Sequence, residues 1–325
     1  MMAEERRTIA QRKGPSSGSA RTAALIALLA TAATACGDAG HQSERGVAQA
    51  AGDAAAAEPA LALGPIETTP RDSVIFRETM EWAHDERLDT LDIGPMVAAI
   101  GQRFVGAPYE PGTLDPPGPE RLIINLRTFD CVTFVESMVA MARALRAGDP
   151  SFDAFARELR RIRYRDGLSQ EYPERLHYFS DWIAANDARG IVRALTDSLG
   201  GEPDPEPIDF MSTHVDAYRQ LADTANLRAI REIEREISAR GRVYIPEDRI
   251  AAVASEIRDG DVIAATSTVE GLDIAHTGIA LWRNGALHLM HAPLVGKEVE
   301  ISELPLAARI QRIDGQDGIM VARPR

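Results

Sequence analysis

The chain has 325 residues, of which 45% are hydrophobic and 26% charged, a composition typical of a globular protein with a packed core. Its 36 basic and 49 acidic residues give a formal net charge of −13. Because a nucleic-acid-binding surface needs clustered lysine and arginine side chains, this balance argues against DNA or RNA as a partner.

The first 36 residues have the layout of an export signal. Basic residues precede an apolar run over residues 23–35, which is shorter than the roughly 20 residues that a membrane-spanning helix needs. Residues 33–36, Ala-Thr-Ala-Cys, resemble the lipobox of bacterial lipoproteins, which predicts lipidation of Cys36. Cleavage by ordinary signal peptidase after Ala-Thr-Ala is the alternative. Both predict an exported, periplasmic protein, and the lipid on Cys36 would be its link to a membrane.

The remaining elements follow in chain order. Residues 37–72 are small, polar and repetitive, and are predicted to form a disordered tether. One folded domain is predicted over residues 73–325. Its helices are predicted from apolar spacing to begin at residue 73 and to cover residues 93–104, 131–147, 152–162, 178–185 and 227–240. A proline-rich loop is predicted at residues 200–207, and strands at residues 262–266, 274–282, 286–291 and 319–322. Helices followed by antiparallel strands are typical of an α+β fold.

The helix after Asp130 carries the cysteine Cys131 in its first turn. Two adjacent apolar stripes predict that this helix is buried on most of its circumference, with Asp130 as N-cap and Gly148 as its end. Unpaired backbone N–H groups and the helix dipole favour negative charge there, which predicts a lowered thiol pKa and a reactive thiolate. A structural buried cysteine is the alternative.

Two histidines in the strand region are candidates to act with this thiol. Asn284 and Gly285 form the strongest short signal for a two-residue hairpin turn. That turn places His276 and His291 on one face of the sheet as diagonal neighbours, and His288 on the other face. A three-residue turn would promote His288 instead. The histidine pair could also bind a metal, but third and fourth ligands at diagnostic spacing are lacking.

Several stretches resemble known cell-wall hydrolases. Gly106-Ala107-Pro108-Tyr109, Phe129-Asp130-Cys131, His276-Thr277-Gly278-Ile279 and His291-Ala292 are similar to motifs of the papain-like NlpC-type cysteine peptidases. The chain resembles more closely the related N-acetylmuramoyl-L-alanine amidase-like family, over nearly everything from Gly106 to the C-terminus. The matching stretches include RTFDCVTFVE (127–136), RYRDG (163–167), LHYFSDWIAAN (176–186), IDFMSTH (208–214), GLDIAHTGIA (271–280), HLMHAP (288–293) and GIMVARP (318–324).

The resemblance implies a papain-like α+β fold, in which N-terminal helices, with the nucleophile at a helix N-terminus, pack on an antiparallel sheet. It also implies Cys131 as nucleophile, His276 as general base and acid, and His291 as the orienting residue, with no metal or organic cofactor. Tyr109 resembles the tyrosine that shapes the oxyanion region. Polar residues of the family-specific stretches are predicted to line the substrate cleft, with ordinary structural hydrogen bonding as the alternative for each: Tyr164, Arg165, Asp166, His177, Asp181, Ser212 and His214.

The implied activity is cysteine-dependent hydrolysis of peptidoglycan or its muropeptide fragments, at the amide between N-acetylmuramic acid and L-alanine. An endopeptidase that cuts between D-glutamate and the diamino acid of the stem peptide is the nearest alternative. A non-catalytic muropeptide-binding lipoprotein and a protein-modifying thiol enzyme, such as a glutaminyl deamidase, are the others. The sequence does not separate the two peptidoglycan bonds.

Overall fold

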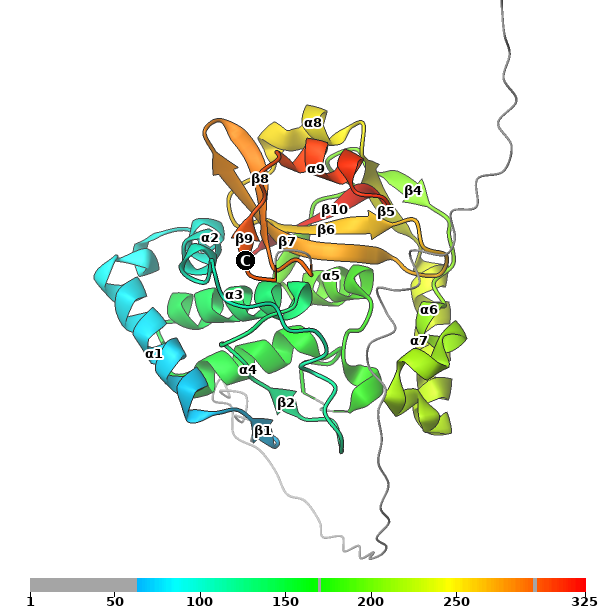
Figure 1. Ribbon diagram of the computed structural model, residues 1–325, viewed down its shortest axis with the longest axis horizontal. Helices are drawn as coiled ribbons and strands as arrows, with labels where there is room; N and C mark the ends of the chain where they lie inside the picture. Colours follow the sequence, from blue (N-terminus) through cyan, green and yellow to red (C-terminus); the bar gives the residue numbers. More distant parts are fainter. Residues whose placement is uncertain (1–62, 169–170, 295–296) are drawn as a thin grey trace, which may run out of the picture. The chain divides into compact units, whose positions relative to one another are not determined.

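The computed structural model describes residues 63–168, 171–294 and 297–325 (Figure 1). The predicted signal peptide, Cys36 and most of the predicted tether lie outside the described residues. The α-helices of the described part are α1 (Pro70–Asp85), α2 (Ile93–Arg103), α3 (Cys131–Arg146), α4 (Phe152–Arg163), α5 (Phe179–Ala188), α6 (Phe210–Thr213), α7 (Thr224–Arg240), α8 (Ile250–Val253) and α9 (Leu306–Arg312). Its strands are β1 (Ile66–Glu67), β2 (Leu122–Ile123), β3 (Val192–Ala194), β4 (Glu202–Asp204), β5 (Arg242–Pro246), β6 (Val262–Ser267), β7 (Ile274–Arg283), β8 (Ala286–His291), β9 (Glu300–Ile301) and β10 (Gln316–Pro324).

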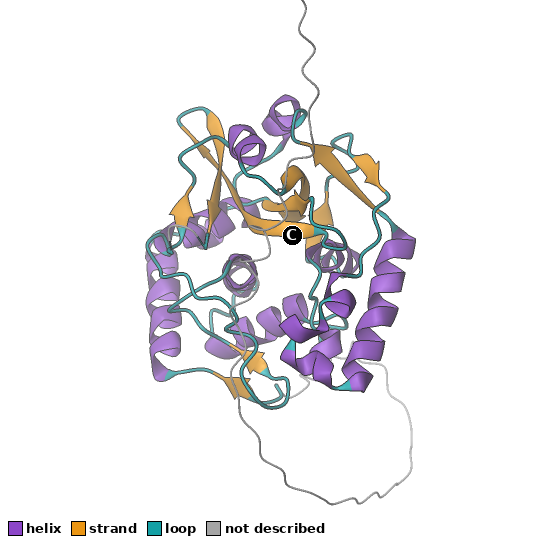
Figure 2. Ribbon diagram, turned by 45° about the vertical axis from the view of Figure 1, so that its right-hand side comes forward, coloured by secondary structure: helices purple, strands orange, loops and turns teal. Residues whose placement is uncertain are grey.

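The main sheet is antiparallel and has helices on both faces, which makes the fold α+β. Its strands run in the order β4-β5-β10-β6-β7-β8-β9, and β3 also pairs with β10. One face packs against the core built by α1 to α5, and the other against α8 and α9 (Figure 1, Figure 2). Alternate residues of β6 show the two faces, because Ala264 belongs to the first core and Ala265 to the second.

The folded region begins earlier than the sequence predicts. Strand β1 pairs in parallel with β2, and α1 starts three residues before the predicted domain boundary at residue 73. Thr69 and Asp72 form a capping box at the start of α1. The buried Asp72 carboxylate also accepts hydrogen bonds from the backbone N–H of Leu126 and from Arg127. Polar contacts, which apolar periodicity cannot reveal, therefore attach this segment to the domain.

A second difference concerns the proline-rich residues 200–207. They are predicted to form a loop, yet they contain strand β4, which pairs with β5. Strand β4 lies at the end of the strand order, where one side of a strand needs no backbone partner. Proline lacks an N–H group and is therefore tolerated at such an edge.

Helix α3 lies at the centre of the larger core, as its two apolar stripes predict. Residues 133–142 of α3 are all buried, and Asp130 forms a capping box with Thr133 in which the Asp130 carboxylate accepts the Thr133 N–H at 2.7 Å. Gly148 follows the helix with a positive φ of 72°, a conformation in which glycine is favoured. The predicted start and end of this helix are confirmed.

The hairpin of β7 and β8 has the predicted two-residue turn. Asn284 and Gly285 both have positive φ, at 52° and 80°, and Leu281 pairs with His288. The His288 ring bonds through Nδ1 to the carbonyl of Ser302 at 2.8 Å, away from the other two histidines.

No helix within the described residues is long and apolar enough to cross a bilayer.

Candidate active site

Cys131 is the first residue of α3, and strand β7 holds it in place. The Thr277 hydroxyl donates a hydrogen bond of 2.8 Å to the Cys131 carbonyl oxygen. The Cys131 side chain is partly exposed. Because Thr277 follows His276 directly, this contact joins the start of α3 to the strand segment that carries His276.

His276 and His291 are in direct contact. His276 Nε2 lies 2.8 Å from His291 Nδ1, and the two rings stand nearly perpendicular with their centres 4.8 Å apart. Burial lowers the pKa of His276 to about 3, with a further contribution from the Arg309 cation. Burial also lowers the pKa of His291 to about 2, together with His276 and Arg309. Both rings are therefore neutral near pH 7, and Nδ1 of His276 is the nitrogen left for a further partner.

Thr277 and His276 point to opposite faces of β7. Thr277 pairs with Ala264 on the face that packs against α3, whereas His276 pairs with Ala265 on the face that packs against α9. Within the described structure no hydrogen bond joins the Cys131 thiol to His276. In free enzymes such catalytic contacts are often long and tighten only when substrate binds, so this geometry is compatible with a thiol–imidazole pair.

The Cys131 thiol has a raised pKa, opposite to the effect expected from a helix N-terminus. Burial and the neighbouring Asp130 carboxylate raise the pKa to about 11, while hydrogen bonds from the backbone and side chain of Thr277 lower it. Desolvation of the charged form is the largest cause of the raised pKa. The resting site holds a neutral thiol beside neutral imidazoles.

The Asp130 charge provides a test of this electrostatic balance. Asp130→Asn keeps a side-chain oxygen that can cap α3 but removes the negative charge next to Cys131. We expect faster alkylation of Cys131 by iodoacetamide at pH 7–9, because the thiolate fraction rises about tenfold for each unit by which the thiol pKa falls. Peptide mass spectrometry distinguishes Cys131 from Cys36. An unchanged rate would show that the Asp130 charge does not control this thiol.

Tyr109 lies close to the nucleophile candidate. Its pKa is raised to about 12 by burial and by the charges of Cys131 and Asp130. The backbone N–H of Tyr109 donates to the Lys297 carbonyl at 2.7 Å, and Tyr109 forms a bridge with Phe129. Tyr109 thus remains a protonated hydroxyl donor near Cys131 at neutral pH.

The other predicted cleft residues have structural partners. Tyr164 is fully buried and donates its hydroxyl to Glu120 at 2.9 Å. Asp181 is also buried and pairs with Arg165 at 2.6 Å and Arg240 at 2.9 Å. Each of the remaining four side chains bonds to nearby main chain: Asp166 accepts from the Leu168 N–H at 2.7 Å, His177 contacts the Tyr172 carbonyl at 2.7 Å, Ser212 donates to the Asp209 carbonyl at 3.4 Å, and His214 contacts the Phe210 carbonyl at 2.9 Å.

That these seven residues line a substrate cleft stays a prediction, although two of them are buried. Tyr164 and Asp181 are inaccessible because they satisfy polar groups inside the fold. Burial and the Arg175 cation lower the pKa of His177 to about 3, so this ring is a neutral hydrogen-bonding group. Short sequence stretches that the chain shares with a family therefore include residues that stabilise the fold.

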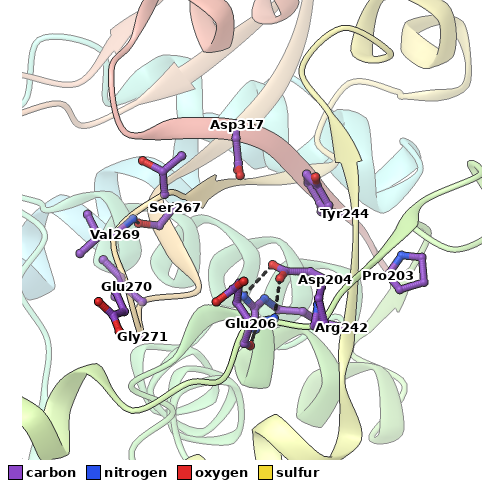
Figure 3. A pocket seen from close by; sticks show the side chains of 13 residues that line it. Pro203, Asp204, Glu206, Arg242, Tyr244, Ser267, Val269, Glu270, Gly271 and Asp317 are labelled. Atoms are coloured by element: carbon purple, nitrogen blue, oxygen red, sulfur yellow. Dashed lines mark hydrogen bonds and ion pairs between the residues drawn. The ribbon is translucent and has the colours of Figure 1, made fainter. Parts of the chain in front are cut away.

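Sequence reasoning missed a cavity of about 400 Å³ beside the loop that joins β6 to β7 (Figure 3). Asp204, Arg242, Ser267 and Asp317 are among its lining residues, and Arg242 pairs with Asp204 at 2.6 Å. Ser267 follows Thr266, which pairs with Ile274 on β7. Ile274 lies two residues before His276. These residues carry no motif in the sequence, since strands far apart in the chain bring them together.

Metal binding finds no support in the arrangement of ligands. Among the described residues, no three histidine, cysteine, aspartate or glutamate side chains are grouped so that they could hold a metal ion. His276 and His291 instead contact each other through ring nitrogens.

The fold and site together define an α+β protein with a cysteine at the start of a buried helix and a histidine pair on the adjoining sheet. A family model described as N-acetylmuramoyl-L-alanine amidase-like matches residues 99–319, more than half of the chain. The chain belongs to this family. No sequence among the curated proteins matches it.

Solved structures of three bacterial proteins are similar to this chain. An N-acetylmuramoyl-L-alanine amidase from Bacteroides uniformis is 35% identical, with a TM-score of 0.69, over 72% of this chain and 99% of that chain. A protein from Bacteroides fragilis described as a putative xylanase is 37% identical, with a TM-score of 0.65, over 69% of this chain and 98% of that chain. A Legionella pneumophila protein, 22% identical over 78% of this chain and 94% of that chain, has a TM-score of 0.58 and shows the fold alone.

Proposed function

We propose that this protein is a cysteine amidase that hydrolyses peptidoglycan or its muropeptide fragments. The observation that carries the proposal is the hydrogen bond from Thr277 to Cys131, which joins the start of α3 to the residue that follows His276. Membership of the amidase-like family and the similarity to the Bacteroides uniformis amidase support the amide between N-acetylmuramic acid and L-alanine as the bond that is cut.

The proposed reaction is acyl transfer through Cys131. His276 accepts the thiol proton at Nδ1 while Sγ attacks the lactyl carbonyl carbon of the muramic acid. Because the free thiol has a pKa of about 11, proton transfer accompanies the attack. The imidazolium then donates its proton to the departing amino group of L-alanine, which leaves a thioester on Cys131. Water, activated by His276, hydrolyses the thioester and restores the thiol.

The negative oxygen of the tetrahedral intermediate needs hydrogen-bond donors. The backbone N–H of Cys131 lies in the first turn of α3, where it has no intrahelical partner. Tyr109 supplies a hydroxyl that stays protonated at neutral pH and lies near Cys131. We assign these two groups to the oxyanion region.

The predicted site of action is the periplasm. The export signal and Cys36 lie outside the described residues, so this part of the proposal rests on the residue pattern alone. Metabolic labelling with a fatty acid, compared between the full chain and a Cys36→Ser variant expressed in bacteria, tests it. Label that depends on Cys36 supports a lipid anchor, and unlabelled protein in the periplasm supports ordinary signal cleavage.

The product identifies the bond. Purified muropeptides are incubated with the full chain and analysed by mass spectrometry, and we expect free disaccharide together with an intact peptide that begins with L-alanine. Cleavage between D-glutamate and the diamino acid would replace the amidase by an endopeptidase. If muropeptides bind without any Cys131-dependent product, the protein is a binding lipoprotein. Deamidation of a glutamine substrate would make it a protein-modifying enzyme.

A further inference from the structure

The outer ring nitrogen of His291 is buried without a hydrogen bond. His291 Nε2 has no hydrogen-bond partner among the described residues, although its other nitrogen contacts His276. The polar atom that faces it is Oε1 of Glu300, at 3.6 Å. A buried N–H group without a partner costs free energy, so a reason for this arrangement is needed.

The sheet places Glu300 next to His291 by register. His291 on β8 pairs directly with Glu300 on β9, and side chains of such a pair lie on the same face of an antiparallel sheet. The Glu300 side chain is 43% exposed, so part of it borders solvent. The distance exceeds an ordinary N–H···O hydrogen bond by about 0.7 Å, which a side-chain rotation can close.

The direction of the hydrogen bonds determines whether His276 can act as a base. For Nδ1 of His276 to accept the thiol proton, the neutral ring must carry its proton on Nε2 and donate it to Nδ1 of His291. His291 must then carry its own proton on Nε2, which points toward Glu300. In the opposite tautomers, Nδ1 of His276 is protonated and cannot accept the thiol proton.

We propose that Glu300 is a positioning residue that accepts the Nε2 proton of His291 and so selects the tautomer of His276 that can deprotonate the cysteine. This inference deepens the proposed amidase function and rests on it for its kinetic part. Glu300 does not touch the reacting atoms. It acts through His291, in the way that a carboxylate orients a metal-bound or catalytic histidine in other enzymes.

The surrounding charges are compatible with this role. Burial raises the pKa of Glu300, the Arg309 cation lowers it, and Glu298 and Glu303 raise it. Arg309 also disfavours the protonated form of His291. A carboxylate beside His291 offsets that repulsion at the stage when the histidine pair carries the thiol proton.

The kinetic test compares three substitutions in the full chain. Glu300→Ala is expected to lower kcat for muropeptide cleavage by about 10- to 100-fold with little change in KM. Glu300→Gln keeps an oxygen acceptor and should recover part of this loss. Glu303→Ala is the matched control, because it removes the same charge from a nearby exposed glutamate and should leave kcat unchanged. Equal kcat values for Glu300→Ala and Glu303→Ala would overturn the proposal.

A second measurement does not depend on activity. Long-range proton–nitrogen NMR correlations of ¹⁵N-histidine-labelled protein report the tautomer of each ring, and a His291→Asn variant assigns the His291 signals. We expect His291 to be protonated at Nε2 in the wild type and to lose this preference in Glu300→Ala but not in Glu303→Ala. The same tautomer in all three proteins would overturn the role of Glu300. If the wild type shows this tautomer but cleaves no muropeptide, the amidase proposal fails while the assignment of Glu300 stands.

Discussion

The Cys131→Ala variant is expected to lose at least roughly 10⁴-fold in kcat/KM for muropeptide cleavage. Alanine removes the sulfur that forms the acyl-enzyme bond, and neither His276 nor Tyr109 can replace it as a nucleophile. Measurement of product formation by mass spectrometry under single-turnover conditions separates this loss from slow product release.

Two controls make this result specific to the nucleophile. The Cys131 side chain is partly exposed and alanine favours helix, so the thermal unfolding midpoint should stay close to that of the wild type. Cys36→Ser removes the other thiol of the chain and should retain full activity in the purified protein. Retention of activity by Cys131→Ala within tenfold of the wild type would refute the cysteine mechanism.

Replacement of Arg163 by methionine should cause a large loss of stability. Arg163 Nε lies 2.8 Å from Glu136 Oε2, and both side chains are almost completely buried, at 3% and 2% exposure. Arg163 also donates to the Ile123 carbonyl at 2.6 Å. Its loss leaves a buried carboxylate and a backbone acceptor without their partner, so we expect a decrease of about 3–5 kcal/mol in the free energy of unfolding at pH 7.

The loss of stability caused by Arg163→Met should depend on pH in a defined direction. Burial raises the pKa of Glu136 and Arg163 lowers it, so the variant should have a Glu136 pKa still further above its unfolded value. A group with a raised folded pKa contributes stability below its unfolded pKa and loses it as pH rises through the folded pKa. The difference between variant and wild type should therefore shrink from pH 7 toward pH 5.

An exposed ion pair provides the matched control for Arg163→Met. Arg77 and Glu81 lie 3.8 Å apart on α1 with exposures of 63% and 67%. Arg77→Met should change the free energy of unfolding by less than about 1 kcal/mol, because surface ion pairs are screened by water. Urea unfolding of both variants and the wild type measures the two changes in the free energy of unfolding. Similar losses for the two would show that the Glu136 pair does not stabilise the core.

The local features around the candidate nucleophile could be predicted from the sequence. Asp130 as N-cap, Gly148 as the residue after the helix, and the Asn284-Gly285 turn follow from rules that act over a few residues. The turn then determines which histidines share a face of the sheet, and the contact between His276 and His291 agrees with that face assignment.

Features that depend on contacts between distant segments could not be predicted. Thr69 and Asp72, which fall within the predicted tether, form a capping box, and the Asp72 carboxylate accepts a hydrogen bond from the distant Leu126 N–H. Strand β4 likewise forms by pairing with β5. Some polar residues of the family stretches have partners from distant parts of the chain, such as Glu120 for Tyr164.

The sequence by itself determined the class of fold, the helix that begins at Cys131 and the face shared by His276 and His291, because helix caps, periodicity and turn geometry are local properties. The tertiary structure alone decided the protonation of the site and which carboxylate faces the outer ring nitrogen of His291. The pKa of Cys131 follows from burial and the nearby charge of Asp130, and Glu300 faces His291 because β9 pairs with β8. Burial and strand register arise only when distant segments pack together. Burial removes water from around the thiol and so raises its pKa, and register sets which side chains face each other across two strands.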